Sequence, residues 1–289
     1  GAVTGTVYRR SKTNRHFRII IDGEEKAMKT LFIISDVQSF YTLLKQSLDA
    51  AGFDRDNPDH IIISCGDLCD RGKEAIKMLE FINALEEERK ICVIGNHELL
   101  MEALIRRGYP IYRDMHNGTM DTAIQLTGTE NETAALKKMP DCALWNAYKK
   151  SWRWFFEVGD MIFVHGWIPC SEVITKYGET LTKAYDPAWR EASRRVLEAA
   201  TWLNGMEAWD EGIKEPGKTV FCGHWHSSWG HAFLHHQGAE FPSENGEKAC
   251  FDPFEDEGIC ALDGCTALSQ QVNVVVREVE DEVWELAVR

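Results

Sequence analysis

Between Met28 and Gly108 the sequence alternates short apolar runs with segments in which apolar residues recur at helical spacing. The apolar runs are Leu31–Ser35, Ile61–Cys65 and Ile91–Ile94, and each has the length of a buried strand. Strand and helix together repeat every ~30 residues, the size of one βαβ unit. This alternation predicts an α/β fold with a mainly parallel inner sheet.

The remainder of the chain follows a less regular pattern. Residues 108–157 are helical in pattern and carry several tryptophans, so we expect a helical insert there. Further strands are expected at Met161–Val164, Thr219–Cys222, Ile259–Leu262, Val272–Val276 and Val283–Ala287. Residues 231–257 are rich in Gly, Pro, His and acidic residues, which indicates a long loop.

A length of 289 residues with 44% hydrophobic residues suits one large domain with a substantial core. We assign residues 28–289 to this domain. Residues 1–27 are expected to be an N-terminal extension, either a strand and turn or a segment introduced by cloning. No run approaches the ~18 apolar residues that a membrane helix needs, so no membrane partner is expected.

The cysteine content and the net charge indicate which cellular compartment and which classes of binding partner to expect. The nine cysteines are odd in number, form no CxxC pair and partly lie in apolar strands. This pattern predicts buried free thiols in a reducing compartment, and hence a cytoplasmic location. The net charge of −14 disfavours binding to nucleic acids, whose phosphate backbones an acidic surface repels.

Polar residues follow directly after five of the expected strands. The five segments are SDVQ (35–38), GDLCDRG (66–72), GNHE (95–98), HG (165–166) and GHWH (223–226). A single Asp after a strand is usually a turn or helix-cap residue. Ligands of open α/β sheets, however, gather beyond the carboxyl ends of the strands. Five such segments therefore predict a metal site at this edge of the sheet.

The motifs GDxxDRG, GNHE, HG and GHxH, in this order, resemble those of the calcineurin-like metallophosphoesterases. The DRG ending of the GDxxDRG motif is similar to that of the bacterial and phage phosphoprotein phosphatase branch. The resemblance is close over residues 29–107, sparse over 160–226 and general beyond. It implies a four-layer α/β/β/α sandwich with mixed, largely parallel sheets and a metal site at the C-terminal strand ends.

The resemblance also implies a site for two divalent metal ions, with manganese expected and iron, zinc or magnesium as alternatives. The implied ligands are Asp67 as a bridge between both ions, Asp36 and His226 at the first ion, and Asn96, His165 and His224 at the second. A neutral asparagine ligand limits the negative charge that would repel a phosphate. In such enzymes a hydroxide held between the ions attacks phosphorus in line.

Three further residues acquire implied roles from the same resemblance. His97 would be the general acid for the leaving oxygen, and Asp70 would pair with it and favour the protonated ring. Arg71 would clamp the phosphate, because its planar fork matches two oxygens. The alternative for Asp70 and Arg71 is a surface ion pair at a helix start.

The first motif departs from the DxH of the family, because Gln38 stands where the family has histidine. An amide oxygen can bind a hard cation, although less well than imidazole, and it suits Mn²⁺ or Mg²⁺ better than Zn²⁺. Gln38 is therefore a candidate ligand, and His226 could restore a nitrogen to the first ion. Three outcomes remain open: a weak but active first site, an empty one, or a change introduced to impair the protein.

A second departure concerns the phosphate pocket. Related phosphatases use another arginine between the HG and GH motifs, where this chain has Trp202–Gly205. Arg190, Arg194 and Arg195 are nearby in sequence, but they lie on a predicted amphipathic helix and are expected to be solvated.

The expected function is a phosphomonoesterase acting on Ser/Thr phosphoproteins, with a phosphorylated protein or small phosphoester as substrate. A first alternative is hydrolysis of dinucleoside tetraphosphates or other small nucleotides, because relatives with that activity share these motifs. The tryptophans of the insert would suit it if they line the pocket, although core or lid packing is expected for them. A second alternative is a catalytically impaired module that binds phosphate or a partner, because of Gln38.

Overall fold

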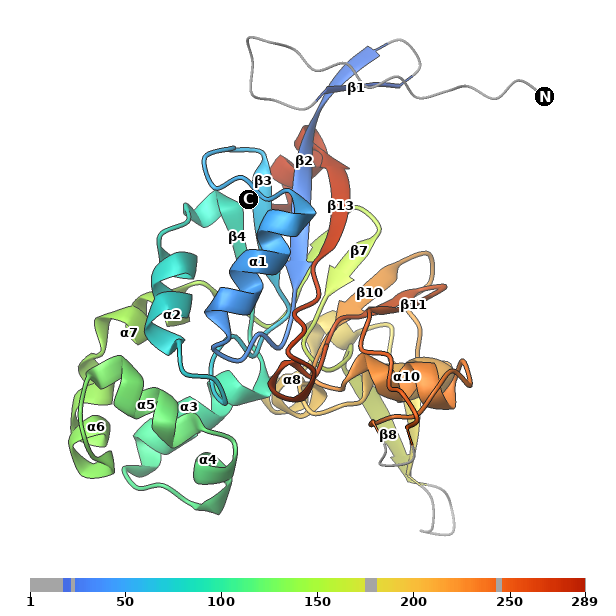
Figure 1. Cartoon of the computed structure of the whole chain (residues 1–289). Helices are drawn as coiled ribbons and strands as arrows, with labels where there is room; N and C mark the ends of the chain where they lie inside the picture. Colours follow the sequence, from blue (N-terminus) through green and yellow to red (C-terminus); the bar gives the residue numbers. More distant parts are fainter. Residues whose placement is uncertain (1–17, 22–23, 175–180, 243–245, 289) are drawn as a thin grey trace.

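The computed structural model describes residues 18–21, 24–174, 181–242 and 246–288 of the chain. Two sheets lie in the centre of the molecule, with helices on the outer side of each (Figure 1). The expected N-terminal extension lies largely outside the described residues. Its described residues form β1 (Arg18–Ile21) and the start of β2 (Glu24–Ile34), which pair antiparallel.

The first sheet contains the strands that the alternating pattern predicts. Its order is β1-β2-β3-β4-β5, and β13 also pairs with β2. The strands β2, β3 (His60–Ser64), β4 (Lys90–Val93) and β5 (Trp152–Arg153) run parallel, whereas β13 (Val275–Glu280) is antiparallel to β2. Helices α1 (Tyr41–Ala51), α2 (Ala75–Asn83) and α3 (Asn96–Arg107) connect or follow the parallel strands.

The second sheet has the order β11-β12-β10-β7-β6. Its inner strands β7 (Met161–Phe163), β10 (Thr219–Cys222) and β12 (Ile259–Ala261) are parallel, and its edge strands β6 (Phe156–Val158) and β11 (Phe254–Asp256) are antiparallel to their neighbours. A separate two-stranded sheet consists of β8 (Cys170–Ile174) and β9 (Leu181–Tyr185).

The remaining helices lie in the insert and in the C-terminal part of the chain. In the first group are α4 (Tyr112–His116), α5 (Thr119–Thr127), α6 (Glu132–Lys138) and α7 (Ala143–Lys150). In the second are α8 (Arg194–Ala200), α9 (Gly205–Asp210), α10 (Ser227–Phe233), α11 (Thr266–Ser269) and α12 (Asp281–Val288). Short 3₁₀ turns span Glu87–Arg89, Met139–Asp141 and Trp189–Glu191. None of the described helices combines the length and apolar content needed to cross a bilayer.

Successive residues of β2 face two different cores, as the alternation of side chains along a strand requires. Leu31 and Ile33 pack between the sheets together with Phe221 of β10. Phe32 and Ile34 instead face the helices. A third core lies on the outer side of the second sheet, where residues of β7, β10 and β12 pack against tryptophans and α9. Three cores separate four layers, so the expected α/β/β/α sandwich is confirmed.

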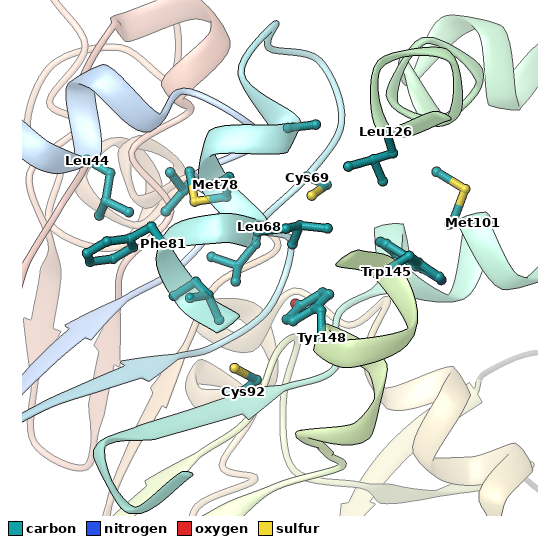
Figure 2. Close-up of a cluster of buried hydrophobic side chains, with 14 of the residues drawn as sticks. Leu44, Leu68, Cys69, Met78, Phe81, Cys92, Met101, Leu126, Trp145 and Tyr148 are labelled. Atoms are coloured by element: carbon teal, nitrogen blue, oxygen red, sulfur yellow. The ribbon is translucent and has the colours of Figure 1, made fainter. Parts of the chain in front are cut away.

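The core beneath the helices also contains aromatic residues of the insert (Figure 2). Trp145 is only 1% exposed, and its ring lies edge-on to Tyr148 and Trp152 at centroid distances of 5.8 and 5.5 Å. Its indole N–H donates to Glu102 of α3, which satisfies the one polar atom of the buried ring. Trp145 is therefore a core residue and does not line a pocket.

Two expectations about the C-terminal part of the chain were wrong. Val283–Ala287, expected as a strand, lies within α12. Its apolar residues recur at helical spacing, and Trp284 packs against Phe156 at a centroid distance of 5.5 Å. The expected loop 231–257 contains the end of α10 and β11, which pack on each other.

Candidate metal centre

The carboxyl ends of parallel strands from both sheets meet at one edge and carry the candidate ligands. Asn96 lies at the centre: its Oδ1 is 2.8 Å from Nε2 of His165 and 2.8 Å from Nδ1 of His224. Oδ2 of Asp67 is 3.3 Å from the same nitrogen of His165. The possible ligand atoms of Asp67, His165 and His224 all lie within 4.8 Å of one another. Residues separated by up to 157 positions thus converge on one point.

This arrangement of atoms fits a divalent cation. The Asn96 amide oxygen can only accept hydrogen bonds, so both imidazole nitrogens that face it need a proton, or the three atoms must share a cation. Imidazole, carboxylate and amide oxygen are ligands for Mn²⁺, Zn²⁺ and Fe²⁺ alike. In the part of the chain that the structure describes, this is the one cluster of histidines, cysteines or carboxylates with such spacing.

The orientation of His165 is determined by its second ring nitrogen. Nδ1 donates to the main-chain carbonyl of Cys65 at 2.7 Å, which leaves Nε2 directed at Asp67 and Asn96. Metal-binding histidines characteristically use one nitrogen for such a support and the other for the ion. Burial lowers the pKa of His165, but the nearby Asp67 carboxylate has the larger opposite effect and raises the pKa to about 10.

His224 lies beside His165 with the rings 5.3 Å apart. Burial and the neighbouring His165 charge lower the pKa of His224 to about 3. The positive charge on His165 thus keeps His224 neutral. Asp67, although buried, keeps a pKa below its ordinary value because His165 and His97 face it. The site therefore presents an ionised carboxylate beside a neutral imidazole.

Asp36 lies next to this group, at the end of β2. Its Oδ2 accepts from Ser35 Oγ at 2.6 Å and from the His224 main-chain N–H at 2.9 Å, and the residue is 1% exposed. Gly223 makes this approach possible, because a Cβ there would lie 2.1 Å from the Asp36 carboxylate. Burial, followed by repulsion from Asp263 and Asp67, raises the pKa of Asp36.

Left-handed backbone conformations are concentrated at this edge. Asp36, Gln38, Asp67, Asp70, Arg71 and His224 all have positive φ angles, between 52° and 79°. Residues other than glycine rarely adopt this backbone conformation, which costs about 1–3 kcal/mol of conformational strain per residue. Such strain persists only where surrounding contacts enforce it, and it is concentrated at functional sites.

His97 and Asp70 form a buried pair beside the centre. Nδ1 of His97 is 2.7 Å from Oδ2 of Asp70, which also accepts from Thr119 Oγ1 of the insert at 2.6 Å. Burial lowers the pKa of His97, but Asp67 and Asp70 raise it to about 9. Arg71, by contrast, is exposed and forms no ion pair with any described residue. Asp70 and Arg71 are therefore not paired with each other at the surface.

Gln38 and His226, the other two candidate ligands of the first ion, have different surroundings. Gln38 is 8% exposed, and its main chain donates to Asp67 and accepts from Gly72, so it joins the first two motifs. Nε2 of His226 lies 2.7 Å from Oε1 of another acid, Glu240, which can orient the ring. His226 does not belong to the group of ligand atoms formed by Asp67, His165 and His224.

Several residues at the site went unrecognised in the sequence. Glu98 of the GNHE motif is 1% exposed and accepts from the N–H groups of Asp67, Leu68 and Gly95. Asp263, at the end of β12, is 7% exposed. Glu98 is the last residue of the GNHE motif, which could have identified it, whereas Asp263 lies outside the five polar segments.

The stretch where a second arginine was expected carries an exposed aromatic ring instead. Trp202 is 44% exposed, and its ring lies edge-on to His224 at 5.6 Å. The guanidinium of Arg113, from α4, lies 5.8 Å from the Trp202 ring. Arg190, expected to be solvated, pairs with Glu157 and Glu215 and is structural.

Comparison with known proteins gives local and global matches. The symmetrical bis(5'-nucleosyl)-tetraphosphatase of Aeromonas hydrophila is 37% identical over 71 residues, which span 25% of each chain. A cold-active protein-tyrosine phosphatase from Shewanella sp. superposes with a TM-score of 0.48 at 13% identity, covering 94% of this chain and 93% of that chain. A metallophosphoesterase from Sphaerobacter thermophilus gives a TM-score of 0.42 at 16% identity, with 89% and 85% coverage.

The family model of the calcineurin-like phosphoesterases matches residues 29–228. This range contains all five polar segments and the strands β3, β4, β7 and β10. The chain belongs to the calcineurin-like phosphoesterase family.

Proposed function

We propose that this protein is a phosphoric ester hydrolase that uses two divalent ions and removes phosphate from Ser/Thr phosphoproteins. The observation that carries the proposal is the position of the Asn96 oxygen, 2.8 Å from a nitrogen of both His165 and His224. Family membership supports the reaction class. The DRG form of the second motif favours the phosphomonoesterase branch.

The two ions would be held by different ligand sets. Asn96, His165 and His224 would hold one ion, and Asp36, with Gln38 or His226, the other. Asp67 would contact both, because one carboxylate has two oxygens to share. When bound, such ions activate water and offset the negative charge of the phosphate. The oxygen-rich set around Asp36 favours Mn²⁺ or Mg²⁺ over Zn²⁺.

Two residues outside the ligand sets would act on the substrate directly. Although burial lowers the pKa of His97, Asp67 and the hydrogen-bonded Asp70 raise it to about 9, so the ring can deliver a proton to the leaving oxygen. Arg71 has an exposed guanidinium without a carboxylate partner among the described residues, so it is free to bind two phosphate oxygens. Gly118 allows its main chain to approach Arg71, where a Cβ would lie 2.7 Å from the Arg71 nitrogen.

A second candidate function is hydrolysis of dinucleoside tetraphosphates. The exposed Trp202 ring beside His224 favours it, because an aromatic face next to the metal centre suits a nucleobase. The local match to symmetrical bis(5'-nucleosyl)-tetraphosphatases supports it as well. We further propose a cytoplasmic location, because all nine cysteines are free in the structure.

The test is hydrolysis of p-nitrophenyl phosphate after chelation and reloading with Mn²⁺. Asp67→Asn is expected to abolish turnover, while the exposed Asp210→Asn is expected to retain it. A panel of phosphoserine peptides and dinucleoside tetraphosphates then separates the two candidate functions by kcat/KM. Lack of turnover by the unaltered chain with any divalent metal, together with retained phosphate binding, would favour the impaired binding module.

A further inference from the structure

Asp263 lies at the end of a sixth strand that reaches the metal centre. In the parallel pair of β10 and β12, Cys222 is opposite Ala261, and the Leu262 N–H donates to the Cys222 carbonyl at 2.8 Å. Two residues further along each strand, His224 and Asp263 are therefore neighbours. The Asp263 carbonyl accepts from the Ser227 N–H at 2.8 Å, which fixes the main chain of Asp263 against the GHWH segment.

The Asp263 side chain is largely buried and has few partners. The residue is 7% exposed, and Oδ1 accepts from the Cys265 N–H at 2.7 Å. Among the described residues, Oδ2 has no hydrogen-bond donor, and neither lysine nor arginine pairs with Asp263. A largely buried carboxylate with a single hydrogen bond is stabilised when a cation binds to its open oxygen.

Hydrogen bonds link the surroundings of Asp263 to Asp36. The main-chain N–H of His224, the neighbour of Asp263 across the strand pair, donates to Asp36 Oδ2 at 2.9 Å. A further contact joins the two segments, because Thr266 Oγ1 donates to the Asp36 carbonyl at 3.1 Å. Asp36, Asp67 and Asp263 are thus three buried acidic residues at the same edge of the sheets.

This concentration of negative charge lies beside the weakest point of the expected ligand set. Gln38 offers only an amide oxygen where the family has an imidazole, and an amide carries no charge to offset that of an ion. We propose that Asp263 supplies a carboxylate oxygen to the ion held by Asp36 and Asp67, and so compensates for Gln38. This inference rests on the proposed two-ion function and adds a ligand from a strand outside the recognised motifs.

The test measures metal binding rather than activity. Isothermal titration of Mn²⁺ into the chelator-treated full chain compares the wild type with Asp263→Asn and with the exposed control Asp210→Asn. We expect two sites in the wild type and in the control. In Asp263→Asn, the affinity of one site should fall about tenfold or more, while the other is unchanged. Unchanged affinity of both sites in Asp263→Asn would overturn this inference but not the proposed function.

Urea unfolding of the metal-free proteins separates a ligand from a structural residue. Because Asp263→Asn removes a buried charge but keeps an acceptor for Cys265, the metal-free variant should be as stable as the wild type or more stable. A clear loss of metal-free stability would show a structural role and overturn the inference. Absence of Mn²⁺ binding to the wild type would instead refute the proposed function, on which the inference rests.

Discussion

Replacing Glu98 with glutamine tests whether one buried carboxylate holds the loops that carry the ligands. Oε2 of Glu98 accepts from the N–H groups of Asp67 at 2.9 Å and Gly95 at 2.8 Å. Oε1 accepts from the Leu68 N–H at 3.1 Å and the Tyr148 hydroxyl at 3.0 Å. Glu98 therefore joins the loop after β3 to the start of α3, and the two loops supply Asp67 and Asn96.

The cost follows from these four donors. Glutamine can keep its oxygen in the place of Oε2 and turn its amide toward Leu68 and Tyr148. The Tyr148 hydroxyl can rotate to accept, so only the Leu68 N–H loses its acceptor, at about 1–3 kcal/mol. The other hydrogen bonds lose their charge assistance, but relief of burial offsets this, because burial raises the pKa of Glu98. We expect the free energy of unfolding to fall by about 1–3 kcal/mol.

Urea unfolding of the metal-free protein measures the loss of stability. Mn²⁺ titration measures the affinity, which falls if Asp67 is displaced. We expect a 10- to 100-fold weaker affinity, on the order of that caused by other losses of support for a metal ligand. Glu102→Gln, four residues along the same helix, is the control, because glutamine retains the acceptor for Trp145. If Glu98→Gln matches this control in stability and metal affinity, the carboxylate does not position the site.

Three further outcomes are expected. Gln38→His should strengthen Mn²⁺ binding at one site about tenfold by restoring an imidazole, and an unchanged titration would show that position 38 does not reach the ion. Trp202→Ala should raise KM for dinucleoside tetraphosphates about tenfold but not for phosphoserine peptides, and equal effects on both would exclude a base-stacking role. Glu215→Gln should lower stability by about 1–2 kcal/mol at pH 7. Although burial raises the pKa of Glu215, hydrogen bonds from Tyr185 and Arg190 lower it overall, so this contribution is present above the ordinary value of 4.5 and fades as the pH falls below it. Equal destabilisation in thermal unfolding at pH 7 and about pH 3 would contradict the assignment.

The regular half of the fold was predictable because its strands are buried on both faces. Ile61, Ile62 and Ile63 are at most 1% exposed, so β3 appears in the sequence as a continuous apolar run. The polar start of β2 was missed, because Glu24–Ala27 pairs with β1 through main-chain hydrogen bonds, which leave no apolar pattern. The final helix was missed because a short apolar run is ambiguous between strand and helix until its packing partner is known.

Candidate ligands were predictable wherever a short motif accompanies them. Asp67, Asn96, His165 and His224 each follow a recognisable strand end, and the structure brings their ligand atoms together. The supports of these residues were not predictable, because they come from distant parts of the chain. The carbonyl that holds His165 belongs to Cys65, 100 positions earlier, and a main-chain carbonyl has no residue identity to recognise.

Spatial order in the second sheet explains why Asp263 was overlooked. In the sequence, His224 is followed by a helix and a long irregular segment before the next strand of the sheet begins. In the structure, β10 lies between β7 and β12, so His224 is flanked by His165 on one side and Asp263 on the other. Adjacency in a parallel sheet is decided by which strands pair, and motifs do not encode pairing. A carboxylate without any motif thereby becomes a candidate ligand as soon as its strand is placed beside β10.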